Sequence, residues 1–365
     1  MAHIFKYHSA QQKGIVVFTD TELDGSNWKE NFSDEEIPIL NDVIANKYFV
    51  GMHYGSAPRH YSSWRENISF VMASLDQLTF NPDCVPFFIP LNSRNFLPDF
   101  FQQTDTTKYW DVLCVSTNAP YKNLNYFVQS IRALYDHEVF VKVLLIAFAT
   151  SWDELKTDSE YYKIVEDYEN NFSMKEKEFF TLMRLSPEYK GMGMSMKTIA
   201  HFYNSSKVFA MLSASEGESR VIHEALACGL TVVCFAGLTG GGRDYLSEEN
   251  SCQFADYNDL PNTLVKAVNR YNAGHRFDTH EVSQHLLAQN TLPILKEYFC
   301  DLYSQYNEAF DTADNFVNTD YLNFRLPAHF FESLPWADNN VRVGPTANIL
   351  STQQYELFCK ELGLF

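Results

Sequence analysis

Long apolar runs are absent from this chain. The longest one, residues 140–149, is interrupted by Lys142 and is too short to cross a bilayer. The opening residues, MAHIFKYHSAQQKG, lack the apolar core of a secretory signal peptide. We therefore expect neither a transmembrane segment nor a signal peptide.

Clustered positive charge is absent as well. The 28 Lys and Arg residues are outnumbered by 46 Asp and Glu residues, the net charge is −18, and no run of Lys or Arg occurs. Because a basic face supplies most of the affinity for nucleic acid and anionic membranes, the sequence argues against both partners and leaves only peripheral membrane contact open. A hydrophobic content of 45% with 20% charged residues is typical of a globular chain and excludes a disordered one.

Cysteine motifs are also missing. The chain has 7 cysteines, an odd number, and no two of them have the CxxC spacing. This pattern predicts reduced, mostly buried thiols in a cytoplasmic protein and argues against a zinc site. The cysteines are Cys84, Cys114, Cys228, Cys234, Cys252, Cys300 and Cys359.

The length of 365 residues is enough for two domains of roughly 150 residues each. Near the beginning of the chain, short apolar runs predict strands at 14–19, 48–53 and 85–90. The segment FLPDFFQQTDTTKY, which follows, has the composition of a linker.

Beyond this linker, strand and helix patterns alternate. Apolar runs predict buried strands at 110–115, 140–147, 208–212 and 231–235. The segments KNLNYFVQSIRALYDH and 258–269 have the spacing of amphipathic helices, and a third helix is expected over 220–228, with Gly229 ending it. The alternation predicts a doubly wound parallel α/β sheet, which binds ligands beyond the carboxyl ends of its strands.

The segment VFAMLSASEGESRVIHEALACGLTVV is the most informative part of the chain. A strand ends at Leu212, the small flexible loop SASEGES follows, and a helix begins after Ser219, which is a suitable N-cap. The free backbone N–H groups of Arg220 and Val221, together with the helix dipole, form a site for an anion such as a phosphate or diphosphate.

Two acids flank this helix start. Glu216 precedes the helix and Glu224 lies within it, so both can reach one ligand at the anion site. A carboxylate accepts two hydrogen bonds, which suits the vicinal hydroxyls of a ribose or another sugar. The alternative is that both acids serve only as partners of the helix dipole.

The run EGESRVIHE, followed by ALACGLTVV, resembles the E-x7-E donor-binding signature of retaining GT-B glycosyltransferases of the GT4 type. FYNSSKVFAMLSAS, GGGRDYL and ENSCQF are similar to neighbouring segments of that family, as are WDVLCVSTNAPYKNLNYFVQSI and VPFFIPLNSRNFLP upstream. The resemblance is most specific at 213–235 and extends over about 85–270. It implies a GT-B fold, an α/β architecture of two Rossmann-like lobes with a central cleft.

The resemblance also implies a domain organisation. We expect an N-terminal acceptor-side lobe at 1–107, a nucleotide-sugar-binding lobe at 108–285 and a C-terminal tail at 286–365. The N-terminal lobe is shorter than is usual in the family and atypical, because the family's glycine loop is not evident in it. We therefore expect the tail to pack back on the N-terminal lobe and complete it.

Family roles carry over residue by residue. Glu216 would contact the hydroxyls of the donor sugar, and Glu224 would hold the ribose of the nucleotide. The backbone at Arg220 and Val221 would bind the diphosphate. Lys122 would neutralise the diphosphate as it leaves, because a compact ammonium stabilises the charge that grows there.

One family position departs from the pattern. The arginine that precedes the lysine in the family is Thr117 here, and Arg220 or Arg243 is expected to supply the missing cation. His53, in FVGMHYGS, resembles the His-Gly turn that faces the donor and completes the expected catalytic set. The remaining expected donor-binding positions are Asn118, Gly217 and Ser219.

The implied reaction is the retaining transfer of a sugar from a nucleotide-sugar co-substrate to a hydroxyl of a glycan or glycoconjugate, as in polysaccharide biosynthesis. No DxD triplet suited to a metal–diphosphate bridge occurs, so we expect neither a metal nor a further cofactor. The alternatives are a degenerate, non-catalytic GT-B subunit that binds a glycan or a partner enzyme, and a sugar-nucleotide epimerase or phosphorylase. Aromatic residues make up 15% of the chain, and Tyr54, Tyr61 and Trp64 are the first candidates to stack on an acceptor sugar.

Overall fold

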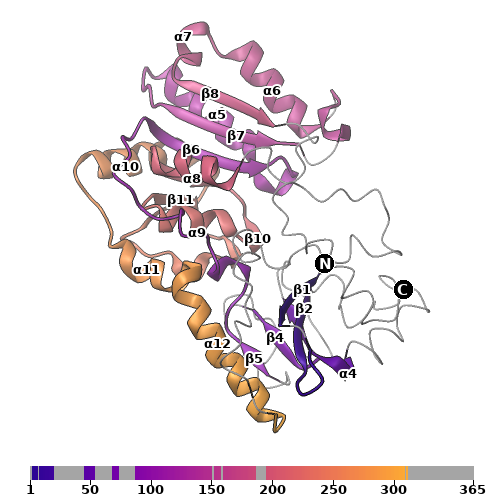
Figure 1. The fold of residues 1–365 in the computed structure, drawn as a ribbon. Coiled ribbons are helices and arrows are strands. Elements are labelled where there is room, and N and C mark those ends of the chain that lie inside the picture. Colours follow the sequence, from indigo (N-terminus) through magenta and orange to yellow (C-terminus); the bar gives the residue numbers. More distant parts are fainter. Residues whose placement is uncertain are drawn as a thin grey trace. The chain divides into compact units, whose positions relative to one another are not determined.

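The computed structural model describes residues 2–6, 8–19, 45–53, 68–73, 87–149, 152–157, 159–185, 195–308 and 310. The chain divides into two compact units (Figure 1). The first, the N-terminal unit, consists of 1–99 and 285–365, and the second, the central unit, consists of 100–284. Each unit has its own hydrophobic core.

The N-terminal unit contains a five-stranded sheet in the order β1-β2-β3-β4-β5. β1 (Ala2–Lys6) runs antiparallel to β2 (Gly14–Thr19). β3 (Tyr48–His53), β4 (Phe70–Met72) and β5 (Phe88–Ile89) continue the sheet in parallel. The strands predicted at 14–19 and 48–53 are confirmed, whereas the one predicted at 85–90 is shorter and its first residues lie outside the described part.

A long helix from the far end of the sequence packs on this sheet. α12 (Ala288–Gln305) buries Leu295, Phe299 and Tyr303 in the same core as the strand residues Ile15 and Phe70. In Figure 1 this helix runs beside β4 and β5. Before this helix, α11 (Thr279–Leu286) leads into a stretch that pairs with the chain near the short helix η4 (Ser93–Asn95). The described part of the predicted tail is therefore integral to the N-terminal unit, and residues 309 and 311–365 lie outside the description.

The central unit contains a fully parallel six-stranded sheet in the order β13-β11-β9-β6-β7-β8. Its strands are β6 (Trp110–Thr117), β7 (Val143–Phe148), β8 (Phe180–Leu185), β9 (Ser206–Met211), β11 (Thr231–Phe235) and β13 (Ser251–Phe254). Counted along the chain, this is the order 3-2-1-4-5-6 of a doubly wound Rossmann sheet. The order reverses between β6 and β9, and this reversal is the switch point of the sheet.

Helices cover both faces of the central sheet. α5 (Leu124–Asp136), α6 (Glu160–Asn171) and α10 (Leu260–Asn272) share one core with alternate strand residues such as Val208 and Ala210. α8 (Met196–Asn204) and α9 (Arg220–Ala227) pack on the other face, where Tyr203 contacts the ring of Phe209. Successive strand residues therefore point to opposite, buried faces, which explains the continuous apolar runs in the sequence.

The predicted strands and helices of the central unit are confirmed, most of them with shifted ends. β7 begins at Val143, after the predicted start at 140, because its pairing with β6 begins only at Val143. The helix predicted at 258–269 begins later, since the side chain of Asp256 accepts a hydrogen bond from the Asn258 N–H and forms the short helix η8 (Tyr257–Asp259) first. Gly229 follows α9 with φ +77°, a conformation that favours glycine at a helix end.

The cysteines and helices bear on two further predictions. The five described cysteines are free, and all but Cys300 are buried, while Cys84 and Cys359 lie outside the description. None of the helices that the structure describes has both the length and the apolar character needed to cross a membrane. The predicted cytoplasmic location stays a prediction.

Candidate functional site

The switch point of the central sheet brings two predicted catalytic residues into contact. β6 ends at Thr117 and leads into the short helix η5 (Pro120–Lys122), while β9 leads into β10 (Ser215–Glu218). Since β6 and β9 are parallel neighbours, both connections leave from the same edge of the sheet. Lys122 Nζ lies 2.5 Å from Glu216 Oε1, and the two side chains are only 15% and 8% exposed.

The segment that carries Glu216 is a strand and not the flexible loop that the sequence predicted. β10 pairs in parallel with β12 (Thr239–Gly241) in a two-stranded sheet of its own. The approach is close at Gly240, where φ is +89° and a Cβ atom would lie 1.7 Å from the backbone oxygen of Glu216. A glycine is therefore required at position 240, beside the Glu216 backbone. Sequence analysis missed the strand β10 because its residues, SEGE, have little strand propensity.

The helix α9 begins at Arg220, as predicted, but Ser219 does not cap it with its side chain. Instead, its backbone oxygen accepts a hydrogen bond from Nδ1 of the buried His223, at 2.8 Å. The hydroxyls of Ser213 and Ser219 are buried and have no hydrogen-bond partner among the described residues. Buried hydroxyls normally form a hydrogen bond to protein, ligand or water. These two, on either side of Glu216 in the sequence, are therefore available to bind a ligand or water.

Glu224, the second acid of the signature, is held inside the protein. It is buried, its Oε2 accepts a hydrogen bond from the Tyr203 hydroxyl at 3.1 Å, and its Oε1 lies 3.2 Å from Arg220 Nε. Burial, and then the Glu224 carboxylate, raise the pKa of Tyr203 well above its ordinary value, so the hydroxyl remains a donor. Sequence analysis missed Tyr203, which no motif distinguishes from other core aromatics.

The other expected donor-binding residues lie around the same edge of the central sheet. Thr117 is the last residue of β6, and the next residue, Asn118, is buried. Gly217 lies in β10, and the Val221 backbone oxygen accepts a hydrogen bond from Tyr203 at 3.4 Å. Arg243, in the short helix η7 (Arg243–Tyr245), is exposed.

Two predicted features lie beyond this description. His53 ends β3, and only its backbone is described. Tyr54, Tyr61 and Trp64 are outside the described residues. Within the described part of the chain, no group of three or more His, Cys, Asp or Glu side chains is arranged to hold a metal ion.

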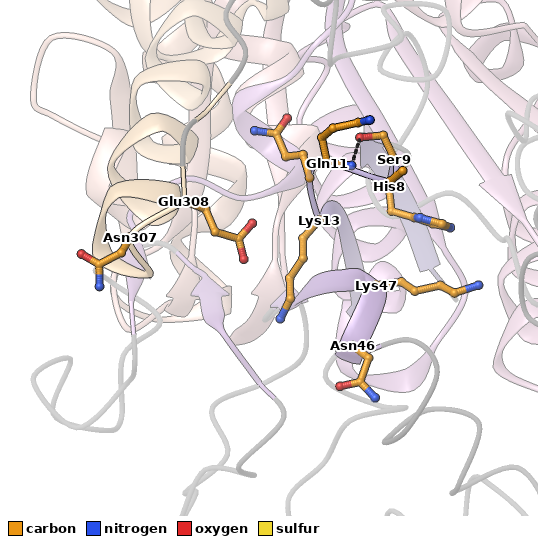
Figure 2. Close-up of a pocket in the computed structure, with 10 residues that line it drawn as sticks. His8, Ser9, Gln11, Lys13, Asn46, Lys47, Asn307 and Glu308 are labelled. Carbon is orange, nitrogen blue, oxygen red and sulfur yellow. Dashed lines mark hydrogen bonds between the residues drawn. The ribbon is translucent and has the colours of Figure 1, made fainter.

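A hollow of about 510 Å³ lies in the N-terminal unit, at the edge of its sheet where β2 and β3 begin (Figure 2). It is lined mainly by polar side chains, among them His8, Lys13, Lys47 and Glu308, which come from the β1–β2 turn, α4 (Ala45–Lys47) and the residues after α12. None of the residues predicted for the donor site lines it. It lies at the opposite edge of that sheet from the end of β3, where His53 is.

Residues 97–274 match the family model described as "Glycosyl transferases group 1". This part of the chain, just under half of its length, is therefore similar to a group 1 glycosyl transferase domain. The matched residues cover the whole Rossmann sheet of the central unit, with the Lys122–Glu216 pair at its switch point. No curated protein matches the chain.

Solved structures with TM-scores above 0.5 support the fold. TarM of S. aureus is 12% identical to this chain, with a TM-score of 0.51 over 74% of this chain and 53% of its own. HepE of Anabaena, solved in complex with UDP-glucose, is 14% identical, with a TM-score of 0.51 over 73% of this chain and 75% of its own. The pneumococcal O-GlcNAc transferase GtfA is 12% identical, with a TM-score of 0.49 over 76% of this chain and 56% of its own. The chain thus spans little more than half the length of GtfA and TarM. The fold that it shares with TarM and HepE is GT-B.

Proposed function

We propose that the chain transfers a sugar from a nucleotide-sugar donor to a hydroxyl of a glycan or glycoconjugate, with retention of the anomeric configuration. The observation that carries this proposal is the contact between Lys122 and Glu216 at the switch point of the group 1 domain. Doubly wound sheets bind their ligands at this point. An ammonium and a carboxylate in contact there match the two parts of such a donor, a diphosphate and a sugar.

The electrostatics at this edge support a diphosphate site. The N–H groups at the start of α9, at Arg220 and Val221, have no acceptor within the helix and carry the positive end of its dipole. The buried hydroxyls of Ser213 and Ser219 add two hydrogen-bonding groups beside them. Lys122 supplies a full positive charge, which stabilises the negative charge that develops on the leaving diphosphate.

In the proposed reaction, the bond between the anomeric carbon and the diphosphate oxygen breaks, and a bond to the acceptor oxygen forms on the same face. The acceptor proton moves to the departing phosphate oxygen. Glu216 accepts hydrogen bonds from the sugar hydroxyls and stabilises the positive charge of the oxocarbenium-like transition state. No side chain is assigned as a covalent nucleophile, so positioning and charge stabilisation supply the rate enhancement.

The test is product analysis with a panel of UDP-, GDP- and dTDP-sugars, each with and without glycan acceptors. We expect one donor to yield a new glycosidic linkage, with the donor's anomeric configuration observed by NMR. Thermal-shift screening with the same nucleotides selects the donor first, because a ligand of the folded state raises the unfolding temperature. Absence of transfer with every donor that binds would reject the proposal.

Metal independence is part of the proposal and has its own test. Transfer measured after treatment with EDTA and removal of the chelator should retain its rate. Loss of activity that returns only on addition of Mg²⁺ or Mn²⁺ would show that a metal bridges the diphosphate.

A second candidate is a non-catalytic subunit of the same fold that binds a glycan or a partner enzyme. The observation in its favour is that both oxygens of Glu224 are engaged by Tyr203 and Arg220, which gives the acid a structural role. Thr117, in place of the family's arginine, points the same way. Nucleotide binding by calorimetry without turnover would favour this candidate, whereas conversion of the donor without an acceptor would indicate an epimerase.

A further inference from the structure

A hydrogen-bonded triangle lies beside the Lys122–Glu216 pair. Asn123 Nδ2 donates to the Leu212 backbone oxygen at 3.1 Å and to the Tyr257 hydroxyl oxygen at 2.7 Å. The Tyr257 hydroxyl in turn donates to the same Leu212 oxygen at 2.6 Å. The triangle joins three separate parts of the central unit, the start of α5, the end of β9 and the start of η8.

Two corners of the triangle adjoin the ion pair along the chain. Asn123 directly follows Lys122, and Leu212 precedes the segment that carries Glu216. Asn123 has φ 56° and ψ 30°, the left-handed conformation, so the chain turns sharply between η5 and α5 at this residue. The triangle therefore fixes the backbone from which both charged side chains extend.

The side chain of Asn123 does not cap the helix that it precedes. Asn123 is the N-cap residue of α5, where an asparagine oxygen usually accepts a hydrogen bond from the first helical turn. It makes no such capping bond, and its amide donates to Leu212 and Tyr257 instead. The Asn123 side chain thus connects the start of α5 to the switch point and leaves the first turn of α5 without a side-chain cap.

The ring of Tyr257 is held from two sides. It stacks on Tyr126 with ring centroids 4.5 Å apart and on Phe235 with centroids 5.5 Å apart, at interplanar angles of 26° and 16°. Burial raises the pKa of Tyr257, so its hydroxyl stays protonated and remains a donor at neutral pH. A ring held in this way directs its O–H bond at one acceptor.

We infer that Asn123 and Tyr257 are positioning residues, whose triangle with Leu212 holds the Lys122 ammonium at Glu216. The inference rests on the proposed function, because it treats the Lys122–Glu216 pair as part of the donor site. In this role neither residue needs to contact the reacting atoms. Both act through Lys122, whose charge is useful in the transition state only if it is placed to within a fraction of an ångström.

The variants follow from the geometry. Tyr257→Phe removes one hydroxyl and keeps the stacked ring, and its control is Tyr168→Phe, because the Tyr168 hydroxyl also donates to a backbone oxygen in this unit, that of Phe180, at 2.8 Å. Asn123→Gly keeps the left-handed backbone and removes both amide donors. Its control is Glu138→Gly, since Glu138 also has a positive φ, 60°, without a place in the triangle.

The first readout needs no donor. The full chain is treated with a limiting amine-acylating reagent, and the modification of Lys122 is followed by mass spectrometry. We expect Lys122 to be acylated several-fold faster in Tyr257→Phe and Asn123→Gly than in wild type, and at the wild-type rate in both controls. Equal rates in all five proteins would overturn the inference.

The second readout separates positioning from general loss of structure. We expect Tyr257→Phe to lower kcat by about tenfold with little change in the KM for the donor, as for an interaction made mainly in the transition state. In a Lys122→Met background, the same substitution should cause no further loss. An equal loss in both backgrounds would show that Tyr257 acts independently of Lys122 and would overturn the inference.

The two readouts distinguish this inference from the proposed function. If the wild-type chain turned over no nucleotide-sugar, the proposed function would fail, and the acylation rates would still decide whether the triangle holds Lys122. If transfer occurred and the acylation rates did not respond to the variants, the proposed function would stand and the positioning role would be lost.

Discussion

Lys122 and Glu216 are 94 positions apart in the sequence, and Lys122 Nζ lies 2.5 Å from Glu216 Oε1. Their contact follows from the strand order, because β6 and β9 are adjacent only in a sheet that reverses its order between them. In contact, the two charges largely neutralise each other. Under the proposed function, a diphosphate would compete with Glu216 for Lys122, and a donor that also offers sugar hydroxyls to Glu216 would satisfy both groups at once.

The first prediction concerns this pair. Lys122→Met and Glu216→Gln should each lower kcat for sugar transfer by about 10²-fold, in the range found for removal of one charge-stabilising group. Lys142→Met is the control, because Lys142 precedes β7 at the opposite edge of the same sheet. Steady-state kinetics with the donor found in the screen provide the measurement. A Lys142→Met loss as large as that of Lys122→Met would contradict a local role for the pair.

The second prediction compares two glycines with similar backbone conformation. Gly240 and Gly274 have φ +89° and +90°, but a Cβ atom at Gly240 would meet the Glu216 backbone oxygen at 1.7 Å, whereas nothing lies within 4 Å at Gly274. Gly274→Ala should therefore cost about 1 kcal/mol of unfolding free energy from backbone strain alone. Gly240→Ala should cost more and also reduce transfer, because β10 must move together with Glu216. Urea unfolding and kinetics on both variants test this, and equal stability losses would be inconsistent with the close approach.

Strands of both sheets could be predicted where they are buried on both faces. The runs that became β2, β3 and β11 are continuous apolar segments, and the structure gives them the predicted ends. β8, FTLMRL, was missed because it is an edge strand whose residues are mostly half-buried. The sequence pattern of a strand depends on what covers it, and an edge strand lacks the second neighbour that makes the pattern clear.

The candidate site was predictable only where the chain itself brings residues to the sheet edge. Lys122 and Glu216 follow adjacent parallel strands, so topology alone places them together. Tyr203 and Tyr257 come from other elements and reach the site through tertiary packing. No spacing in the sequence distinguishes them from the many other aromatic residues of this chain.

The third prediction concerns the buried pair on α9. Arg220 and Glu224 are 10% and 3% exposed, so Arg220→Met leaves a buried carboxylate without its cation and should cost about 3 kcal/mol of unfolding free energy. The control is Arg132→Met, since Arg132 and Asp167 form a pair at the surface, 36% and 24% exposed, which should cost less than about 1 kcal/mol. Urea unfolding of both variants measures the difference.

The same variant bears on donor binding. If Arg220 supplies the positive charge that the family's arginine provides at the position of Thr117, Arg220→Met should also weaken nucleotide binding measured by calorimetry. Arg243→Ala should then leave this binding unchanged. Weaker binding only in Arg243→Ala would assign the cation to the exposed arginine instead. Unchanged binding in both variants would show that neither replaces the family's arginine.

The fourth prediction concerns the buried thiols. Burial raises the pKa of Cys114 and of Cys234 to about 12, and it raises the pKa of Cys228 further. Because the thiolate is the reactive form, these three cysteines should resist alkylation of the folded protein at pH 8, whereas the less buried Cys300 should react before them. Mass spectrometry of the alkylated peptides checks this. Rapid modification of Cys114 in the folded protein would contradict its place in the core.

The last prediction is a pH dependence of stability set by Lys108. Burial lowers the pKa of Lys108 from 10.5 to about 8 in the folded protein. Between about pH 8 and 10.5 the unfolded chain therefore binds more protons at this residue than the folded chain does, so its contribution to the unfolding free energy rises with pH. Below pH 8 both states are protonated, and the cost of burying the charge is fully present.

Lys108→Met isolates this contribution. The variant should be more stable than wild type at pH 7, and its advantage should shrink as the pH is raised from 8 to 10. Urea unfolding of both proteins at pH 7, 8.5 and 10 gives the difference directly, and because all other groups titrate in both proteins, their effects cancel. An advantage that stays constant across this range would show that Lys108 keeps its ordinary pKa in the fold, and that its side chain reaches water despite its position near Cys228.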